Sequence, residues 1–169
     1  LSRTARLVVA ADRSPARLAR LARNIQRLDA PNVSPVAMDA VAPSVSRCDA
    51  ILLDVPCTGT GTFRRHPDAR WRLRPSDLAI LAASQAELLD AAAERVIPGG
   101  LLVYSTCSLE REENDEQVDA FLYRHPEWTL EPPPAGTVPD VVLDGGRLRA
   151  LPQRHGTDGS FAARFRRDA

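Results

Sequence analysis

An apolar run that ends in an acid and a glycine-rich turn constrains the fold of this chain more than any other feature. Residues 51–53 read Ile-Leu-Leu, Asp54 follows, and residues 55–61 read Val-Pro-Cys-Thr-Gly-Thr-Gly. A short apolar run of this kind is typical of a buried strand in a parallel sheet. In open α/β sheets, ligands bind at the carboxyl ends of the strands. We therefore expect Asp54 and Cys57 at the functional edge of a sheet.

A second apolar run has the same organisation. Residues 101–105 follow two glycines and lead directly into Thr-Cys-Ser, which places Cys107 just after the run. Pro56 fixes its own φ and favours an extended residue before it, so the first strand is expected to end in a stiff loop. Two strands of one sheet would then deliver Cys57 and Cys107 to the same edge.

Alternating strand and helix patterns along the chain predict the fold class. Apolar residues at helical spacing separate most of the short apolar runs, which is typical of an α/β fold with a mostly parallel sheet and helices on both faces. The expected strands are residues 6–12, 33–37, 49–54, 101–105, 128–130, 147–151 and 161–166, and the expected helices are residues 15–28, 76–96 and 111–124.

Local signals set the expected ends of these elements. Ser14 and Ser76 are suited to cap the first two helices, and the Pro-Gly-Gly at residues 98–100 is expected to stop the second. Residues 55–75 form a loop long enough to indicate a functional segment. Residues 152–160 join the last two strands without a helix, which predicts one antiparallel strand at the end of the sheet.

Length and cysteine usage exclude several classes of protein. The 169 residues predict one domain with a real core, and no apolar run approaches membrane-spanning length. Cys48, Cys57 and Cys107 are too widely spaced for a disulfide framework or a zinc site. We therefore expect no metal, no membrane association, a monomer and a reducing cytoplasm.

Charge is balanced overall but unevenly distributed. The chain has 22 basic and 22 acidic residues, and every basic residue is arginine. A net charge of zero argues against bulk electrostatic binding of nucleic acid. The arginines gather in residues 3–27, 64–74 and 147–167, and the acids in residues 110–119.

Several motifs together resemble one known family. They are Asp-Val-Pro-Cys at 54–57, Thr-Gly-Thr-Gly at 58–61, Arg-His-Pro-Asp at 65–68, Trp71, Ser-Thr-Cys-Ser at 105–108 and Glu-Glu-Asn at 112–114. The combination resembles the Sun/Nop family of S-adenosylmethionine-dependent RNA cytosine-5 methyltransferases, in particular the bacterial Sun (RsmB) type acting on 16S ribosomal RNA. The resemblance covers nearly the whole chain. It implies a class I methyltransferase (Rossmann-like) fold, S-adenosyl-L-methionine as cofactor and small-subunit ribosomal RNA as partner.

The resemblance also implies that part of the catalytic domain precedes this chain. In the family, the glycine-rich cofactor loop and its strand come before the first strand present here. We therefore expect residues 1–169 to be an N-terminally incomplete catalytic domain. The strands at 7–11 and 51–54 would then face each other across an open position about 10 Å wide. Unpaired backbone groups there would make the chain marginally stable and a weak binder of the cofactor.

The two cysteines carry the expected chemistry. Carbon 5 of cytosine is a poor nucleophile, and a thiolate that adds to carbon 6 activates it. The resemblance implies that Cys107 is this nucleophile and that Cys57 assists release of the product. A helix N-terminus after Cys107 would favour its anion, whereas the glutamates at 110, 112 and 113 oppose it. Buried structural cysteines are the plainer alternative, and Cys48, which matches no motif, is expected to be one.

Three aspartates end predicted strands or follow them closely. The resemblance implies that Asp54 contacts ring nitrogen 3 and the exocyclic amine of a flipped cytosine, and that it also lies beside the cofactor. It also implies that Asp12 binds the ribose hydroxyls of the cofactor and that Asp39 lies beside the adenine. The alternative for Asp12 and Asp39 is an ordinary role as turn or cap acids.

The arginine-rich part of the long loop is the candidate RNA-binding surface. Arginines suit phosphates, and an aromatic ring suits an unpaired base. A solvated loop is an equally good explanation of the same residues. His155 and Asp158, in the loop before the last strand, are better explained by a polar turn than by catalysis. The candidate RNA-binding residues are Arg64, Arg65, His66, Arg70, Trp71 and Arg72.

Three functions are consistent with the fold that we expect. The leading hypothesis is the catalytic domain of an RNA cytosine-5 methyltransferase. The alternative is a non-catalytic RNA-binding fragment that keeps the fold without turnover. A small-molecule methyltransferase gives no reason for two cysteines at one edge of the sheet.

Overall fold

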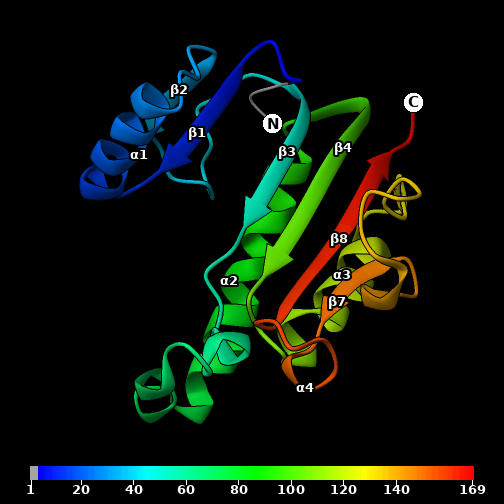
Figure 1. The fold of residues 1–169 in the computed structure, drawn as a ribbon. Helices are drawn as coiled ribbons and strands as arrows, with labels where there is room; N and C mark the ends of the chain where they lie inside the picture. Colours follow the sequence, from blue (N-terminus) through cyan, green and yellow to red (C-terminus); the bar gives the residue numbers. More distant parts are fainter. Residues whose placement is uncertain (1–3) are drawn as a thin grey trace. The chain divides into compact units, whose positions relative to one another are not determined.

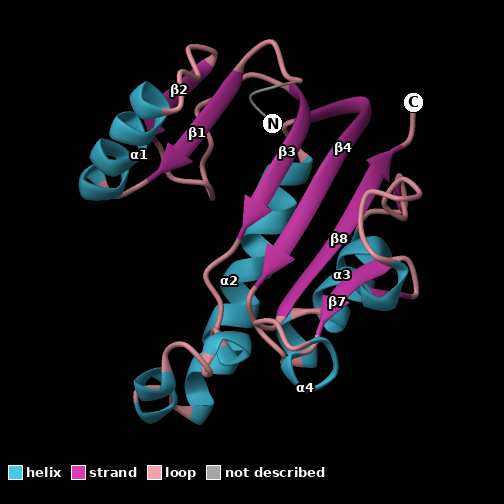
Figure 2. Ribbon diagram, in the orientation of Figure 1, coloured by secondary structure: helices cyan, strands magenta, loops and turns pink. Residues whose placement is uncertain are grey.

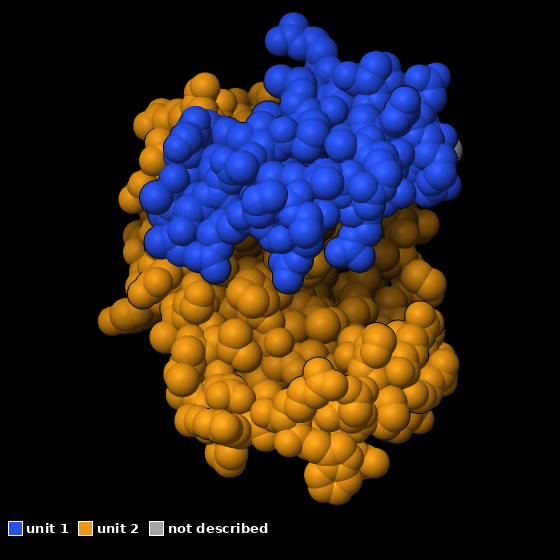
Figure 3. Space-filling view, turned by 90° about the vertical axis from the view of Figure 1, so that its left-hand side faces the viewer, with its two compact units in different colours: residues 1–45 blue, residues 46–169 orange. Residues whose placement is uncertain are grey.

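A computed structural model describes residues 4–169. The chain divides into two compact units, Leu1–Val45 and Ser46–Ala169, which are coloured separately in Figure 3. The prediction that residues 1–169 are one catalytic domain stays a prediction, since compactness does not decide which segments act together.

The first unit is a β-α-β arrangement. Strand β1 (Val8–Asp12) leads into helix α1 (Pro15–Arg27), and β2 (Val33–Ala37) pairs with β1 in parallel. Ser14 caps the helix as predicted, because its side chain accepts a hydrogen bond from the backbone N–H of Arg17 at 3.4 Å. The parallel pairing brings the carboxyl ends of both strands to one edge.

The second unit contains a six-stranded mixed sheet (Figures 1 and 2). Only β3 and β4 pair in parallel, and every other pairing in this sheet is antiparallel. The expected antiparallel last strand is confirmed in β8. The α/β class is confirmed. This sheet has fewer parallel strand pairings than the alternation of strands and helices had suggested. The strands are β3 (Cys48–Asp54), β4 (Val96–Thr106), β8 (Ser160–Arg167), β7 (Arg147–Ala150) and β6 (Leu143–Asp144) in spatial order, with β5 (Trp128–Leu130) also paired to β8.

Helices α2 (Pro75–Ala93) and α3 (Asp115–Arg124) lie on the same face of this sheet (Figures 1 and 2). The Tyr104 hydroxyl on β4 reaches Gln85 of α2 at 3.2 Å. The Phe165 ring on β8 packs 4.8 Å, centroid to centroid, from the Phe121 ring of α3. Alternation along β4 and β8 therefore points one set of side chains into the helices, which explains the buried core. Its largest apolar members are Tyr104, Phe121, Phe161, Phe165, Leu89, Leu102, Val96 and Val118.

The start of α2 differs from the prediction. The helix begins at Pro75 and its cap is Arg74, so Ser76 lies inside the first turn. The backbone N–H of Arg74 donates to Asp77 Oδ2 at 2.9 Å. Proline favours the first helical position because it has no N–H to leave unpaired there. This preference of Pro75 outweighed the capping preference of Ser76.

The end of α2 also differs from the prediction. The helix ends at Ala93, and residues 98–100 lie inside β4 rather than between the helix and the strand. Cys48 pairs with Val96 but Ala50 pairs with Leu101, so β4 bulges outward between these contacts. Gly99 has a φ of +73°, a conformation that glycine adopts without strain. The Pro-Gly-Gly sequence therefore forms a strand bulge.

The helix expected at residues 111–124 is interrupted. A short 3-10 turn, η3 (Arg111–Glu113), precedes α3, and Asn114 between them has φ −119° and ψ −94°. The Asn114 side chain bonds backbone and side-chain groups after β4 instead of continuing the helix, as described below. The long loop 55–75 contains two further 3-10 turns, η1 (Thr60–Thr62) and η2 (Pro67–Trp71). The loop expected at residues 131–146 contains η4 (Asp140–Val142). The expectation that residues 152–160 contain no helix is wrong, because the single turn of helix α4 (Pro152–His155) lies there, with Pro152 at its first position.

No pairing between described strands joins the β1–β2 sheet to the second sheet. The predicted separation stays a prediction. Within the described residues, no helix is long and apolar enough to cross a membrane, and no group of three or more His, Cys, Asp or Glu side chains is arranged to hold a metal ion.

Candidate active site

The two thiols that the sequence placed at one edge are in contact. Cys107 follows β4 directly, Cys57 lies three residues beyond the end of β3, and their Sγ atoms are 3.3 Å apart. The parallel register that pairs Asp54 with Ser105 explains this, because both strands end at the same level. Cys107 is exposed and Cys57 is half-buried. The site therefore presents one thiol to solvent with a second thiol beside it.

The contact shifts the pKa values of the two thiols in opposite directions. The hydrogen bond from Cys57 lowers the pKa of the Cys107 thiol to about 7, although burial and the charges of Asp54 and Glu113 oppose this. The same hydrogen bond, and then burial, raise the pKa of Cys57. Cys107 is therefore the more acidic thiol of the pair, with the Cys57 thiol as its hydrogen-bond partner. From the sequence, a helix N-terminus favours the anion and three glutamates oppose it, so no net change in the pKa of Cys107 is expected. In the structure the largest effect on that pKa comes from the neighbouring thiol.

Asp54 lies at the same edge. It is the last residue of β3, its side chain is exposed, and Ser105 Oγ donates to its Oδ1 at 3.0 Å. Its charge acts on Cys107, as the direction of its effect on the pKa of that thiol shows. The structure thus brings Asp54, Cys57 and Cys107 together.

A buried carboxylate lies behind the thiols. Glu113 is fully closed to solvent. Its Oε1 and Oε2 accept from the Thr58 backbone N–H at 2.9 and 3.2 Å, and its Oε2 also accepts from the Thr58 hydroxyl. Gln85 Nε2 donates to Oε1 at 3.0 Å. Sequence reasoning placed Glu113 in the Glu-Glu-Asn motif and among the acids near Cys107, but it missed this role.

Gln85 extends this cluster into α2. Its Nε2 also donates to Pro56 O at 2.9 Å, and its Oε1 faces the Tyr104 hydroxyl. That hydroxyl lies 2.7 Å from Glu113 O. Gln85 was not singled out from the sequence, although a signal existed. It interrupts the apolar stripe between Leu81 and Leu88, and a polar residue buried there needs partners.

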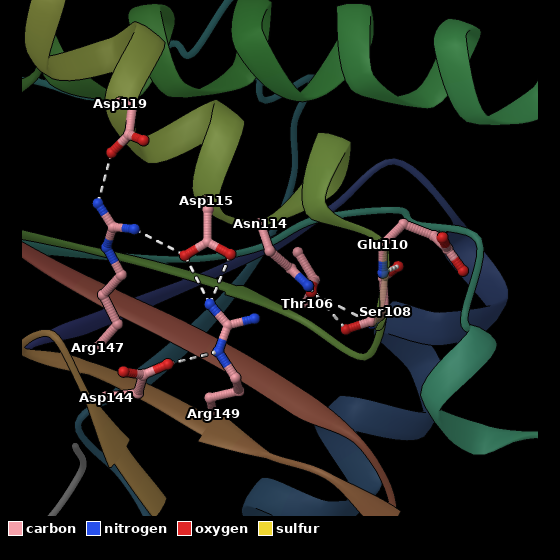
Figure 4. A network of polar contacts seen from close by, with 9 residues as sticks. All are labelled: Thr106, Ser108, Glu110, Asn114, Asp115, Asp119, Asp144, Arg147 and Arg149. Atoms are coloured by element: carbon pink, nitrogen blue, oxygen red, sulfur yellow. Dashed lines mark hydrogen bonds and ion pairs between the residues drawn. The ribbon is translucent and has the colours of Figure 1, made fainter.

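The chain reversal after Cys107 is fixed by Asn114 (Figure 4). The Thr106 hydroxyl donates to Asn114 Oδ1 at 2.6 Å and accepts from Ser108 N at 3.2 Å. Asn114 Nδ2 returns a hydrogen bond to Ser108 O at 2.9 Å, and Glu110 N donates to Ser108 Oγ at 3.0 Å. These hydrogen bonds tie together the residues on both sides of Cys107 and so hold it in a defined turn.

The glycine-rich turn passes close to two backbone segments. Gly61 N donates to Cys107 O at 3.0 Å, and Gly159 N donates to Gly61 O at 2.8 Å. A Cβ on Gly61 would lie 2.7 Å from both Cys107 O and Gly159 O. Glycine at this position is therefore a packing requirement.

His155 and Asp158 hold the loop before β8 in place. His155 Nδ1 accepts from Leu151 N at 2.9 Å, which satisfies a backbone donor of the short helix α4. Asp158 Oδ2 lies 2.8 Å from Arg65 Nε, and Arg64 donates to Gly156 O at 3.0 Å. These contacts agree with the preferred interpretation of the two residues as parts of a polar turn, and they tie that turn to the arginine-rich loop.

The rest of the arginine-rich loop faces solvent. Trp71 is 80% exposed, and the Arg70 guanidinium lies 5.2 Å from the centre of its ring. Arg72 pairs with Asp68 at 2.6 Å, and His66 is exposed. An open depression of about 340 Å³ adjoins this loop and the active-site loop. Its lining residues are Thr58, Phe63, Arg70, Leu73, Arg74, Pro75, Leu78 and Glu110.

The arginines near the C-terminus are mostly engaged within the protein. Arg147 and Arg149 both reach Asp115, at 2.7 and 2.5 Å, and so tie α3 to β7 (Figure 4). Arg147 also pairs with Asp119, and Arg149 with Asp144. Burial opposes ionisation of Asp115, but the hydrogen bonds from the two arginines lower its pKa. Arg164 and Arg166 pair with Glu131 in the same manner. This cluster contributes to structure.

The first unit holds Asp12 and Asp39 at the carboxyl edge of its two strands. Asp12 Oδ1 accepts from Ser14 N at 2.7 Å, a bond that lowers the pKa of Asp12, and its Oδ2 lies 3.3 Å from Arg17. Asp39 Oδ1 accepts from Val41 N at 3.0 Å, and its Oδ2 lies 3.5 Å from Arg13. Both acids thus make the contacts expected of ordinary turn or cap acids. Among residues 4–169, the contact given for the second oxygen of each acid is with an exposed arginine.

Known proteins match this chain closely. The family model described as 16S rRNA methyltransferase RsmB/F matches residues 1–166. The probable ribosomal RNA small subunit methyltransferase B of Synechocystis is 40% identical over 168 residues, or 95% of this chain and 37% of that protein. The ribosomal RNA small subunit methyltransferase B of Thermus thermophilus is 47% identical over 129 residues, or 76% of this chain and 32% of that protein.

A solved structure agrees. NSun6 from Pyrococcus horikoshii superimposes with a TM-score of 0.82 and 33% identity over 96% of this chain and 42% of that chain. This chain spans roughly a third of the length of the curated relatives named here. The fold is that of a class I methyltransferase, as predicted. The match over residues 1–166 shows that the chain belongs to the RsmB/F family of 16S rRNA methyltransferases.

Proposed function

We propose that this chain is the catalytic part of an enzyme that methylates carbon 5 of a cytosine in 16S ribosomal RNA through a covalent adduct with Cys107. The observation that carries the proposal is the 3.3 Å contact between the Sγ atoms of Cys57 and Cys107, beside Asp54. The rRNA substrate is supported by the two relatives described above, which carry the name of ribosomal RNA small subunit methyltransferase B. We further propose that the protein acts as a monomer in the cytoplasm.

The proposed cofactor is S-adenosyl-L-methionine, which when bound supplies an electrophilic methyl group. The acids of the first unit fit such a nucleoside, because carboxylates suit ribose hydroxyls and each has an oxygen whose contact among residues 4–169 is with an exposed arginine. Asp12 would hold the ribose hydroxyls, Asp39 would lie beside the adenine, and Asp54 would contact the cofactor as well as the base.

Cys107 performs the first proposed step. Its thiolate donates an electron pair to carbon 6 of cytosine and forms the C6–S bond. The π electrons of the C5–C6 double bond move onto carbon 5, which becomes nucleophilic. Carbon 5 would take the methyl group, and the electron pair of the broken methyl–sulfur bond would stay on the sulfur of the cofactor. Ring nitrogen 3 takes up a proton from water as the thiolate adds, which offsets the negative charge that the addition brings to the ring. Asp54 accepts hydrogen bonds from that N–H and from the exocyclic amine, and the proton leaves again when the C5–C6 double bond re-forms. A pKa near 7 makes a large fraction of Cys107 thiolate available at neutral pH.

Cys57 performs the second proposed step. Its pKa is raised first by the hydrogen bond to Cys107 and also by the charge of that thiolate. These two causes disappear once the Cys107 sulfur is bonded to carbon 6, and only burial still raises the pKa of Cys57. Cys57 then passes its proton to water and accepts the proton of carbon 5. The electrons of that C–H bond re-form the C5–C6 double bond, the C6–S bond breaks, and Cys107 leaves as a thiolate.

The loop that carries Trp71 is the proposed RNA contact. Its arginines would bind phosphates and its indole ring would stack on an unpaired base. The proposed residues are Arg64, Arg65, His66, Arg70, Trp71 and Arg72.

Methyl transfer itself tests the proposal. We would incubate the chain, and a version extended at its N-terminus, with methyl-labelled cofactor and unmodified 16S rRNA. 5-methylcytosine would then be measured by mass spectrometry of the digested RNA. Label at carbon 5 of a single cytosine supports the proposal. RNA binding by the extended protein without any labelled cytosine would favour the non-catalytic alternative.

A further inference from the structure

The buried carboxylate of Glu113 has no place in the chemistry proposed above. It is fully closed to solvent, lies on the turn after β4 and follows Cys107 by only six residues. Burying a carboxylate is costly unless donors compensate for the lost water. Among the described residues, the hydrogen bonds to this carboxylate come from Thr58 and Gln85.

These donors belong to the loop of the other cysteine. Thr58 is the residue after Cys57, and both its N–H and its hydroxyl point at Glu113. Gln85 binds Glu113 and the carbonyl of Pro56 with the same amide nitrogen, so the residue before Cys57 is held as well. The peptide units on both sides of Cys57 are therefore fixed relative to a residue of the Cys107 loop.

A second contact supports the same link. The Thr58 and Ser108 hydroxyls lie 3.1 Å apart, and Ser108 directly follows Cys107. The loops of the two thiols are thus joined by side chains immediately beside each cysteine. Removal of Glu113 would leave Ser108 as the remaining side-chain partner of Thr58 among these contacts.

We propose that Glu113 is a positioning residue that, through Thr58, holds Cys57 Sγ in contact with Cys107 Sγ. The importance of this contact for catalysis rests on the proposed function, but the contact itself does not. Glu113 touches neither thiol through a hydrogen bond and takes no part in bond making.

Two effects of Glu113 on Cys107 have opposite signs, and this makes the proposal testable. The groups that act on the Cys107 thiol are Cys57, Asp54 and Glu113. Removal of the Glu113 charge alone would lower the pKa of Cys107. Loss of the Glu113–Thr58 contact would weaken the hydrogen bond from Cys57 to Cys107 and so raise the pKa of Cys107. Without Cys57, only the effect of the charge remains.

The experiment is a cycle of four proteins: the unchanged chain, Glu113→Gln, Cys57→Ala and the double variant. Iodoacetamide alkylation of Cys107 is followed against pH by peptide mass spectrometry, with Cys48 as internal control and circular dichroism to check folding. Glu113→Gln changes the pKa of Cys107 by one amount when Cys57 is present and by another in the Cys57→Ala background. We expect the first change to be more positive than the second by at least about half a unit. An equal shift in both backgrounds overturns the proposal.

A milder pair of variants covers the case in which Glu113→Gln fails to fold. Thr58→Val removes the hydroxyl that binds Glu113, and Thr58→Ser keeps it. We expect Thr58→Val to raise the pKa of Cys107 and Thr58→Ser to leave it unchanged, with no effect of either in the Cys57→Ala background. A shift that persists without Cys57 overturns the proposal. The titration needs no RNA or cofactor, so its result is independent of whether the protein methylates rRNA.

Discussion

Cys57 Sγ lies 3.3 Å from Cys107 Sγ, although the two residues are 50 positions apart in the chain. Two parallel strands that end at the same level bring them together, and the thiol contact makes Cys107 the stronger acid. The pair is thus asymmetric before any substrate arrives. That asymmetry predicts that the two cysteines fail differently when they are replaced.

Replacement of each cysteine by alanine separates the two steps. Cys107→Ala should abolish methylation and any covalent RNA adduct, because no thiolate adds to carbon 6. Cys57→Ala should allow addition and methylation but stall release, leaving a protein–RNA band on a denaturing gel. Cys48→Ala is the matched control and should behave as the unchanged protein. An adduct that survives in Cys107→Ala would mean that the roles are reversed.

The pH dependence of thiol reactivity follows from the same contact. Because the pKa of Cys107 is lowered to about 7, its alkylation rate should rise through neutral pH and level off above it. Cys48, whose pKa burial raises, should react only in alkaline solution. Both thiols can be followed in one digest by mass spectrometry. Identical profiles for Cys48 and Cys107 would contradict the assignment of the thiolate.

The parts of the site that sequence predicted well are those fixed by strand ends. Asp54, Cys57 and Cys107 follow apolar runs whose parallel pairing needs no knowledge of side-chain packing. The supporting residues were harder to predict, because Glu113 and Gln85 matter through contacts across 28 or more positions. Residues 110, 112 and 113 are all glutamates, and nothing in the local pattern distinguishes Glu113, which becomes buried, from the other two.

The fold class was predicted correctly, but the ends of some elements were not. Ser76 is a good cap, but Pro75 occupied the first helical position and moved the cap to Arg74. Residues 98–100 read as a helix stop, yet the left-handed Gly99 let them bulge within β4. Asn114 divided the expected third helix because its side chain closes the turn after Cys107. In each case a tertiary contact or a backbone conformation decided between signals that sequence could not rank.

Gly61 provides a test of the packing beneath the active site. Gly61→Ala places a methyl group 2.7 Å from two backbone oxygens, so the turn must move. We expect a decrease of about 1–3 kcal/mol in the free energy of unfolding, measured by urea denaturation, as for other overpacked sites. Gly136→Ala is the control, since a Cβ there meets no atom within 4 Å and only its φ of +77° opposes the change. Because Gly136→Ala reports the cost of a left-handed backbone alone, an unchanged free energy of unfolding in Gly61→Ala would contradict the expected crowding against Cys107 O and Gly159 O.

The arginine-rich loop can be tested through salt dependence. Neutralising arginines that bind phosphates should weaken RNA binding and reduce the slope of log K against log salt by about 0.7–0.9 for each phosphate that no longer has an arginine partner. Arg70 and Arg74 should show the largest effect among these arginines, because Arg64, Arg65 and Arg72 already have partners within the protein. Glutamine variants measured by filter binding at several salt concentrations give the slopes.

The control for this series is Arg23→Gln on the exposed side of α1, which should leave the slope unchanged. If the joint replacement of Arg70 and Arg74 also leaves the slope unchanged, the loop is simply solvated and the RNA contacts lie elsewhere. Trp71→Ala is a separate probe, since removal of the stacking ring should weaken binding without changing the salt slope.

Asp12 offers the sharpest test of the proposed cofactor site. Asp12→Asn keeps an oxygen that can accept from Ser14 N, so the turn after β1 should survive, but it removes the charge and one acceptor. A carboxylate accepts both hydroxyls of a ribose, whereas an amide presents only one acceptor oxygen. We therefore expect cofactor affinity, measured by calorimetric titration of the N-terminally extended protein, to fall about tenfold or more, in line with the strength of hydrogen bonds to charged groups. Asp49→Asn, at the opposite end of β3 from Asp54, is the matched control and should bind normally. Unchanged affinity in Asp12→Asn would leave this aspartate with the turn contact alone and would exclude it from the cofactor site.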